Sequence, residues 1–215
     1  MVEYDFYGMT LLTRLAYVGS DVTQAAEILK KNPEAVNARG KFLNETPLLA
    51  AVTGGTASTT FIKLLLEYGA RLDVEYLAGR TVLHCVAYST NIEHLDLLKG
   101  KAGFPDINYI TNELYTPLHA VCMLGHNAAT MECRKKMAAW LLDNGAKIWR
   151  NTYGNTPIQE ARNQGLNELA DFIEAYTPIH QQANNYLPLS NSVESKKDDP
   201  TELKDNNARL RTINF

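Results

Sequence analysis

The motif Thr-Pro-Leu-His, which begins at Thr116, recurs in altered form at four other places in this 215-residue sequence. The copies read Thr-Leu-Leu-Thr from Thr10, Thr-Pro-Leu-Leu from Thr46, Thr-Val-Leu-His from Thr81 and Thr-Pro-Ile-Gln from Thr156. Successive threonines are 35 to 40 residues apart. A period of this length predicts one supersecondary unit that is repeated and stacked, in place of a single globular core. Such a stack presents an extended surface and rarely encloses a deep active site.

The chemistry of the motif predicts the start of a short helix in each unit. Threonine is a favoured N-cap, because its hydroxyl accepts a hydrogen bond from an otherwise unpaired backbone N–H group. Proline suits the next position, where the N–H has no partner within the helix. Glycines with positive φ are expected to end these helices, at Gly19, Gly55, Gly125 and Gly165. Thr116 and His119 are then scaffold residues that tie a turn to its neighbour.

Longer stretches around the motif carry a family resemblance. The fourth copy continues as Thr-Pro-Leu-His-Ala-Val-Cys from Thr116 and is followed by Gly125-His126. An apolar Leu-Leu run leads to Gly-Ala at residues 64–70 and again at 140–146. The sequence thereby resembles the ankyrin-repeat family, whose unit is a β-turn followed by two antiparallel helices with a Thr-Pro-Leu-His-x-Ala signature.

The resemblance implies an all-α solenoid of about five ankyrin repeats, each a β-turn plus two antiparallel helices, stacked into a curved array. We expect the ankyrin-repeat domain to cover residues 1–176. Its five repeats are expected near residues 4–39, 40–75, 76–110, 111–150 and 151–176.

Some units depart from the pattern. The fourth has a longer segment at residues 127–136, which predicts a loop plus an N-terminal extension of its second helix. In the third, Thr90 replaces the helix-ending glycine, and residues 99–105 lengthen the connection to the next unit. The first unit suits an N-terminal cap. The second helix of the fifth unit, residues 166–176, is expected to cap the other end.

The composition changes from Thr177 onward. Pro178, Pro188 and Pro200 interrupt a stretch rich in Asn, Gln, Ser, Lys and Asp. Such composition is typical of linkers and tails. We therefore expect residues 177–215 to be a polar C-terminal tail or linker that folding does not require, in which residues 201–210 could form a short helix.

Composition and charge exclude several classes of protein. Hydrophobic residues make up 45% and charged residues 21% of the chain, as in ordinary globular proteins. A net charge of −3 without a basic stripe gives no reason to expect nucleic acid. No apolar run approaches a membrane span of about 20 residues, and the first residues do not form a signal peptide. Three cysteines suit a reducing compartment, so we expect a cytoplasmic location.

Three arrangements of residues suggest catalysis or ligand binding, but each lacks the further residues that such a site requires. His119 and Cys122 share one helix, and His84-Cys85 holds the equivalent place in the preceding unit. A Cys–His pair can act as nucleophile and base or supply two zinc ligands. However, the histidines fall on the structural position of the family, and no Cys-x-x-Cys pair completes a metal set. The glycines and lysines of residues 99–103 lack the phosphate-binding spacing. We therefore expect no catalytic residue, metal, cofactor or small-molecule substrate.

The exposed surface of the repeats remains as the candidate site of function. The resemblance implies that a partner binds the concave face, which is built from the turn tips and the exposed side of each first helix. Counting from each threonine selects a set rich in aromatic residues, Met and Arg, which are enriched at protein interfaces. The candidate partner-binding residues are Phe6, Tyr7, Phe42, Leu77, Arg80, Tyr88, Tyr115, Met123 and Tyr153. The same counting also selects Glu45 and Ser89 as exposed positions.

The sequence therefore predicts a non-catalytic module that binds one protein partner of unknown identity, with no nucleic acid and no membrane. An alternative is a secreted bacterial effector that uses the array to target a host protein, in which case the chain acts in the host cytoplasm. A third hypothesis, an enzyme with a Cys/His site at Cys85 or Cys122, is kept for comparison.

Overall fold

Each threonine motif begins a helix in the computed structural model, which describes residues 4–19, 21–54, 57–124 and 130–177. The described residues belong to one unit of the chain and form five pairs of helices. The first helices of the pairs are α1 (Leu11–Val18), α3 (Pro47–Gly54), α5 (Val82–Ser89), α7 (Pro117–Val121) and α9 (Pro157–Asn163). The second helices are α2 (Val22–Lys31), α4 (Thr59–Glu67), α6 (Ile92–Leu98), α8 (Met131–Asp143) and α10 (Asn167–Tyr176). Two 3₁₀ helices, η1 (Pro33–Asn37) and η2 (Leu77–Gly79), lie in the connections.

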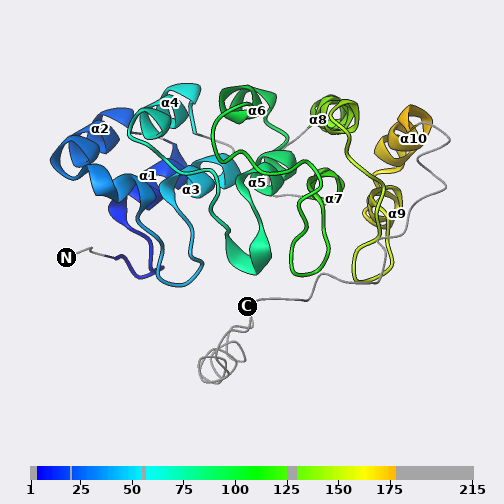
Figure 1. Ribbon diagram of the computed structural model, residues 1–215, viewed down its shortest axis with the longest axis horizontal. Coiled ribbons are helices and arrows are strands. Elements are labelled where there is room, and N and C mark those ends of the chain that lie inside the picture. Colours follow the sequence, from blue (N-terminus) through cyan, green and yellow to red (C-terminus); the bar gives the residue numbers. More distant parts are fainter. Residues whose placement is uncertain (1–3, 20, 55–56, 125–129, 178–215) are drawn as a thin grey trace, which may run out of the picture. The chain divides into compact units, whose positions relative to one another are not determined.

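The helices form two layers with the turns along one edge (Figure 1). First helices pack on first helices, α1 on α3, α3 on α5, α5 on α7 and α7 on α9, and second helices pack on one another in the same order. Within the described residues, β structure is limited to two isolated bridges, Tyr4 with Thr10 and Tyr76 with Arg80. The predicted all-α solenoid with five stacked helix pairs is confirmed.

The leucine two residues after each of the first four threonines forms the centre of the core. Leu12, Leu48, Leu83 and Leu118 are each at most 1% exposed. Their equivalent in the last pair, Ile158, is only partly buried, because no further pair covers it. Small side chains such as Ala51, Ala87 and Ala161 are buried between the helices, which allows close approach of neighbouring first helices.

The predicted caps are present. Thr10 accepts a hydrogen bond from the Thr13 N–H at 3.1 Å, and Thr156 accepts one from Gln159 at 3.3 Å. Proline occupies the first position of α3, α7 and α9. Thr90, which replaces the helix-ending glycine in the third unit, takes the left-handed conformation (φ 53°) that Gly19 takes at the end of α1.

The second helix of the fourth pair is extended at its N-terminus, as predicted. Helix α8 has 13 residues, compared with 7 in α6, and Thr130 caps it. The extension has a structural role. From its first turn, buried Arg134 donates through Nη1 to the carbonyls of Val121, at 2.6 Å, and Met123, at 2.9 Å. A cation is favoured at a helix C-terminus, so Arg134 fixes the end of the short helix α7.

Other predictions of the sequence lie outside the described residues. These are the helix-ending glycines Gly55 and Gly125, the loop at residues 127–129 and the tail at residues 178–215. The boundary of the tail near residue 177 therefore stays a prediction. Within the described part of the chain, every helix is too short or too polar to cross a membrane.

Candidate binding groove between the third and fourth repeats

Hydrogen bonds between successive turns build the edge on which the candidate residues lie. The Lys41 N–H donates to the Gly8 carbonyl at 2.7 Å, Asn112 to Ala78 at 2.9 Å, and Thr152 to Glu113 at 3.1 Å. These contacts hold the tips of neighbouring turns in a fixed order along the stack. Side chains from successive turns can therefore act on one partner together.

Two histidines link the first helices to this edge. Nδ1 of His84 accepts the Thr81 N–H at 3.2 Å, and Nδ1 of His119 accepts the Thr116 N–H at 3.1 Å. Each Nε2 lies 3.1 Å from a carbonyl oxygen of the next turn, that of Tyr115 for His84 and that of Asn155 for His119. Because a carbonyl only accepts, Nε2 carries the proton in both rings. The predicted role of His119 as a tie between turns is confirmed.

Burial keeps these imidazoles neutral. It lowers the pKa of His84 and that of His119 to about 4, although the carbonyl bonds oppose the shift. Burial also raises the pKa of the Cys85 thiol to about 11 and raises the pKa of the Cys122 thiol. A protonated thiol is a weak nucleophile, and both ring nitrogens of each histidine already have partners. The neighbouring Cys and His residues thus serve the scaffold in this geometry.

The predicted partner-binding residues differ in exposure. Phe6 is 92% exposed, and Tyr7, Phe42, Leu77 and Tyr153 are each more than half exposed. Arg80 is also exposed, whereas Tyr88, Tyr115 and Met123 are partly buried. All nine side chains therefore reach the surface, six of them extensively.

Two further positions were predicted wrongly. Glu45 is only 5% exposed, and it lies against the backbone of its own turn; a Cβ atom on Gly40 would lie 3.3 Å from the Glu45 Cγ. Ser89 is 8% exposed, since its hydroxyl turns back to donate to the Val86 carbonyl of its own helix at 3.1 Å. Neither side chain is available to a partner.

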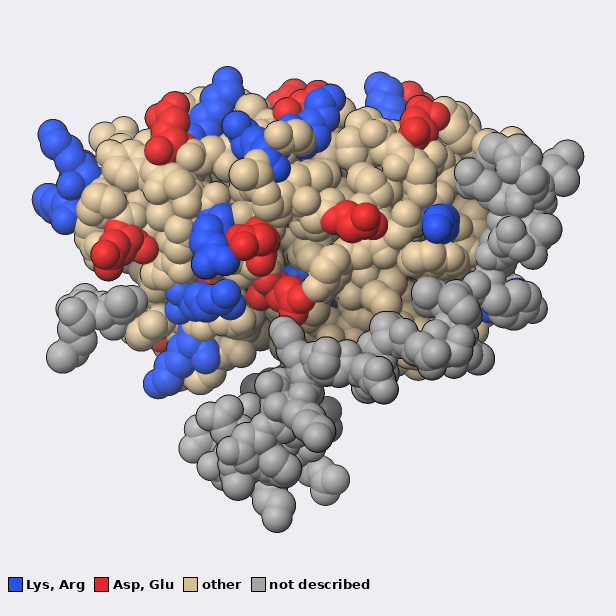
Figure 2. All heavy atoms as spheres, in the orientation of Figure 1, with Lys and Arg blue, Asp and Glu red and all other residues tan. Residues whose placement is uncertain are grey.

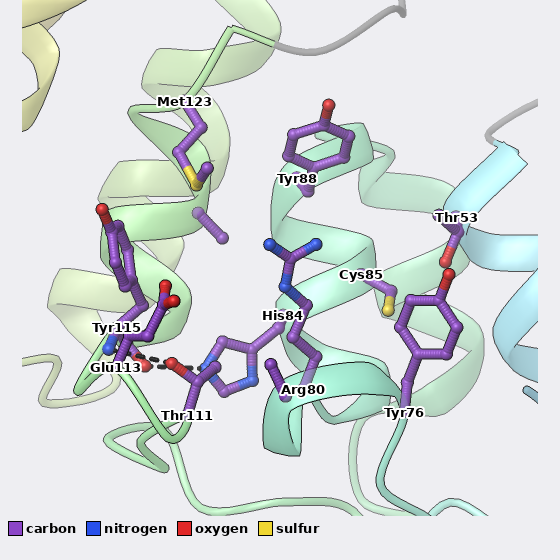
Figure 3. Close-up of a pocket in the computed structure, with 12 residues that line it drawn as sticks. Thr53, Tyr76, Arg80, His84, Cys85, Tyr88, Thr111, Glu113, Tyr115 and Met123 are labelled. Atoms are coloured by element: carbon purple, nitrogen blue, oxygen red, sulfur yellow. Dashed lines mark hydrogen bonds between the residues drawn. The ribbon is translucent and has the colours of Figure 1, made fainter. Parts of the chain in front are cut away.

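Four of the nine residues line one groove between the third and fourth helix pairs. Its volume is about 240 Å³, and Arg80, Tyr88, Tyr115 and Met123 contribute to its walls. Figure 3 shows the Arg80 side chain extending from the third turn into the groove, with Tyr76 on one side and Tyr115 and Glu113 on the other. The small side chains of Thr53, Cys85 and Ala120 leave the space between these larger groups.

Sequence reasoning missed Tyr76, which lies five residues before Thr81. The counting began four residues before each threonine and therefore left this position out. Both Ala78 (φ 62°) and Gly79 (φ 77°) take the left-handed conformation in the third turn, and the Tyr76 ring lines the groove. Thr53 was also passed over, although it lies seven residues after its threonine, the offset that selects Tyr88 and Met123. The signal for Thr53 was therefore present in the sequence.

The aromatic side chains form two clusters. Next to the groove, the rings of Tyr115 and Tyr153 meet edge to face at a centroid distance of 6.5 Å. At the other end of the stack, Phe6 and Tyr7 meet in the same way at 5.6 Å. The Phe42 ring lies against Gly8, where an added Cβ would come within 2.5 Å of it. Rings from neighbouring turns therefore meet at Tyr115 and Tyr153, while at the other end the Phe42 ring lies against the backbone of the first turn at Gly8.

Charge is mixed over the visible surface. Figure 2 shows Lys, Arg, Asp and Glu interspersed on the described part of this face, with no broad area of a single sign. Among the described residues, no group of three or more His, Cys, Asp and Glu is arranged to hold a metal ion. The groove and the two aromatic clusters are the features of this edge that are suited to a partner.

The stacked helix pairs define a helical-repeat protein. His84 and His119 tie the third, fourth and fifth turns together, and a candidate binding groove lies on one edge. The family model of ankyrin repeats, in three copies, matches residues 12–110. Residues 12–110 of the chain are therefore ankyrin repeats. No curated protein matches it. Ankyrin repeats are generally protein–protein interaction modules, and the matched residues include Arg80 and Tyr88 of the groove.

Proposed function

We propose that this chain is a non-catalytic interaction module that binds one protein partner across the edge formed by its turns and first helices, the expected concave face. The observation that carries the proposal is the groove, because it brings together Arg80, Tyr88, Tyr115 and Met123. These residues come from two separate helix pairs. Large side chains around one open space can make several contacts with a single partner.

The chemistry of the surface supports a protein as the partner. Aromatic residues, Met and Arg are enriched in interfaces, and a few anchors near the centre contribute most of the binding free energy. Tyr115 is partly buried and its ring contacts Tyr153 and His119. Its position is thus restricted before binding, which lowers the entropy lost when a partner is bound.

The second aromatic cluster extends the proposed interface toward the N-terminus. Phe6, Tyr7 and Phe42 are large, apolar and exposed, and exposed apolar patches commonly mark sites of interaction. We assign this cluster a supporting role, since the groove has enclosed walls and the cluster does not. Leu77 lies on η2, at the tip of the third turn.

The test is the double variant Tyr115→Ala/Tyr153→Ala in the full chain. The partner is first isolated by affinity capture with the wild-type chain, and its affinity is then measured by isothermal titration calorimetry. Two anchors of about 2 kcal/mol each predict affinity weakened at least about a hundredfold, at about 1.4 kcal/mol per factor of ten.

A matched control is Tyr176→Ala, which removes an exposed tyrosine of α10, in the second-helix layer. We expect this variant to bind like the wild type. Circular dichroism melting curves establish that each variant folds. A folded double variant with unchanged affinity for the partner would refute the proposal.

A further inference from the structure

Arg80 is the one cationic side chain among the residues that line the groove. Its backbone is fixed, because its carbonyl accepts the Tyr76 N–H at 2.6 Å across the third turn. Its guanidinium, by contrast, makes no hydrogen bond or ion pair with any residue in the described part of the chain. The third turn therefore places a guanidinium that has no partner among the described residues beside a space bordered by aromatic rings (Figure 3).

The chemistry of this group restricts what it can bind. A guanidinium presents planar N–H donors that match the two oxygens of a carboxylate. It repels a cation, so the surrounding tyrosines Tyr76, Tyr88 and Tyr115 are unsuited to a lysine or a methylated lysine. The rings and Met123 instead offer apolar contact to the carbon atoms next to an anionic group.

The second charge of the lining favours a carboxylate over a phosphate. Glu113 lies opposite Arg80 in the fourth turn and is exposed. Its carboxylate makes no hydrogen bond or ion pair with the described residues. A phosphate carries a charge of about −1.5 to −2 at neutral pH. One guanidinium with a carboxylate nearby balances a single negative charge better than a double one.

We propose that the groove receives an Asp or Glu side chain of the partner protein, presented next to an apolar side chain that fills the space above Thr53, Cys85 and Ala120. The inference rests on the proposed function and specifies the chemistry of the segment that binds. Arg80 pairs with the carboxylate, while Tyr88, Tyr115 and Met123 contact the apolar neighbour. The pair forms at a partly enclosed site, where a charge-assisted hydrogen bond is stronger than on an open surface.

The experiment selects peptides from a randomised display library on the full-length chain. Selected sequences are synthesised with a fluorophore, and their affinities are measured by fluorescence polarisation. We expect enrichment of Asp or Glu beside an apolar residue. Replacing that acid by its amide should weaken binding to the wild-type chain at least tenfold, but less than twofold in the Arg80→Met variant, which has already lost the cation. Arg39→Met, an exposed arginine outside the groove, should bind like the wild type.

Several outcomes would overturn the inference. These are a selection that yields no binder, binders without an acidic residue, equal affinity for wild type and Arg80→Met, and tighter binding of a phosphoserine peptide than of the acidic one. The proposed function fails separately. If Tyr115→Ala/Tyr153→Ala weakens capture of the natural partner while Arg80→Met does not, the surface binds proteins without the carboxylate pair. If neither variant weakens capture, the proposed function itself is refuted.

Discussion

Acidification should destabilise the fold through the two histidines that tie the turns together. Burial lowers the pKa of both His84 and His119 to about 4, whereas an unfolded histidine has a pKa near 6.5. The unfolded chain therefore binds more protons between these values. The stabilisation is complete above about pH 6.5 and is lost as the pH falls toward 4.

The magnitude follows from the two pKa values. At pH 5 an unfolded histidine is almost fully protonated, while the folded one is mostly neutral, so each histidine lowers the free energy of unfolding by about 2 kcal/mol relative to pH 7.5. Two such groups give roughly 4 kcal/mol, a large fraction of the 5–15 kcal/mol that typically holds a domain together. The protons would go to Nδ1, which must then release the N–H of Thr81 or Thr116.

Urea denaturation of wild type and His84→Leu at pH 7.5 and pH 5 measures the effect. Leucine is already present at the equivalent position, Leu49, where it is 2% exposed. The variant should be less stable at pH 7.5, because the Tyr115 carbonyl loses its donor. Its further loss on going to pH 5 should be smaller than that of the wild type by about 2 kcal/mol. An unchanged pH dependence, or an NMR titration that places the pKa of His84 near 6.5, would refute the reasoning.

Three other predictions test the scaffold. Leu118→Ala should lower the free energy of unfolding by about 2–5 kcal/mol by leaving a cavity in the core, and an unchanged melting temperature would show that the side chain is not buried. Ala78→Gly should stabilise the fold by up to about 1 kcal/mol, because glycine adopts positive φ without strain; Ala139→Gly within α8 should destabilise by about the same amount, and both are read from urea curves. Alkylation of the native chain, followed by mass spectrometry, should label partly exposed Cys133 before Cys85, and fast labelling of Cys85 would revive the enzyme hypothesis.

The sequence allowed the scaffold to be predicted because the scaffold is made of local rules repeated five times. Thr116, Pro117 and Leu118 specify a cap, a first turn and a core position within three residues. The extension of α8 and the place of Thr90 at the end of α5 also followed from comparing one unit with another. Each of these features depends on residues close together in the chain, so its physical cause is visible in the sequence.

The groove could be predicted only in part, since it depends on contacts between units. Counting from each threonine found Tyr88, Tyr115 and Met123, but it went back only four residues before the threonine. It therefore left out Tyr76, which lies five residues before Thr81 and lines the groove. The same counting treated Glu45 as exposed, although it is only 5% exposed and lies against Gly40 of its own turn. Burial of this kind depends on how the folded turn packs, which a single motif does not specify.

The contacts of His84 connect the stability of the stack to the shape of the groove. Its Nε2 binds the carbonyl of Tyr115, whose N–H in turn donates to the Thr111 hydroxyl at 3.1 Å. These are the dashed contacts of Figure 3, and His84 and Thr111 both line the groove. The family's structural histidine thus fixes the backbone from which a proposed anchor ring projects. Nε2 of His119 likewise lies 3.1 Å from the carbonyl oxygen of Asn155, which is two residues after Tyr153.

Replacing either histidine should therefore weaken partner binding even where the chain remains folded, because the backbone that carries the anchor rings is no longer held in place. A partner that binds His84→Leu as tightly as wild type, at a pH where both are fully folded, would show that the turn keeps its shape without the imidazole.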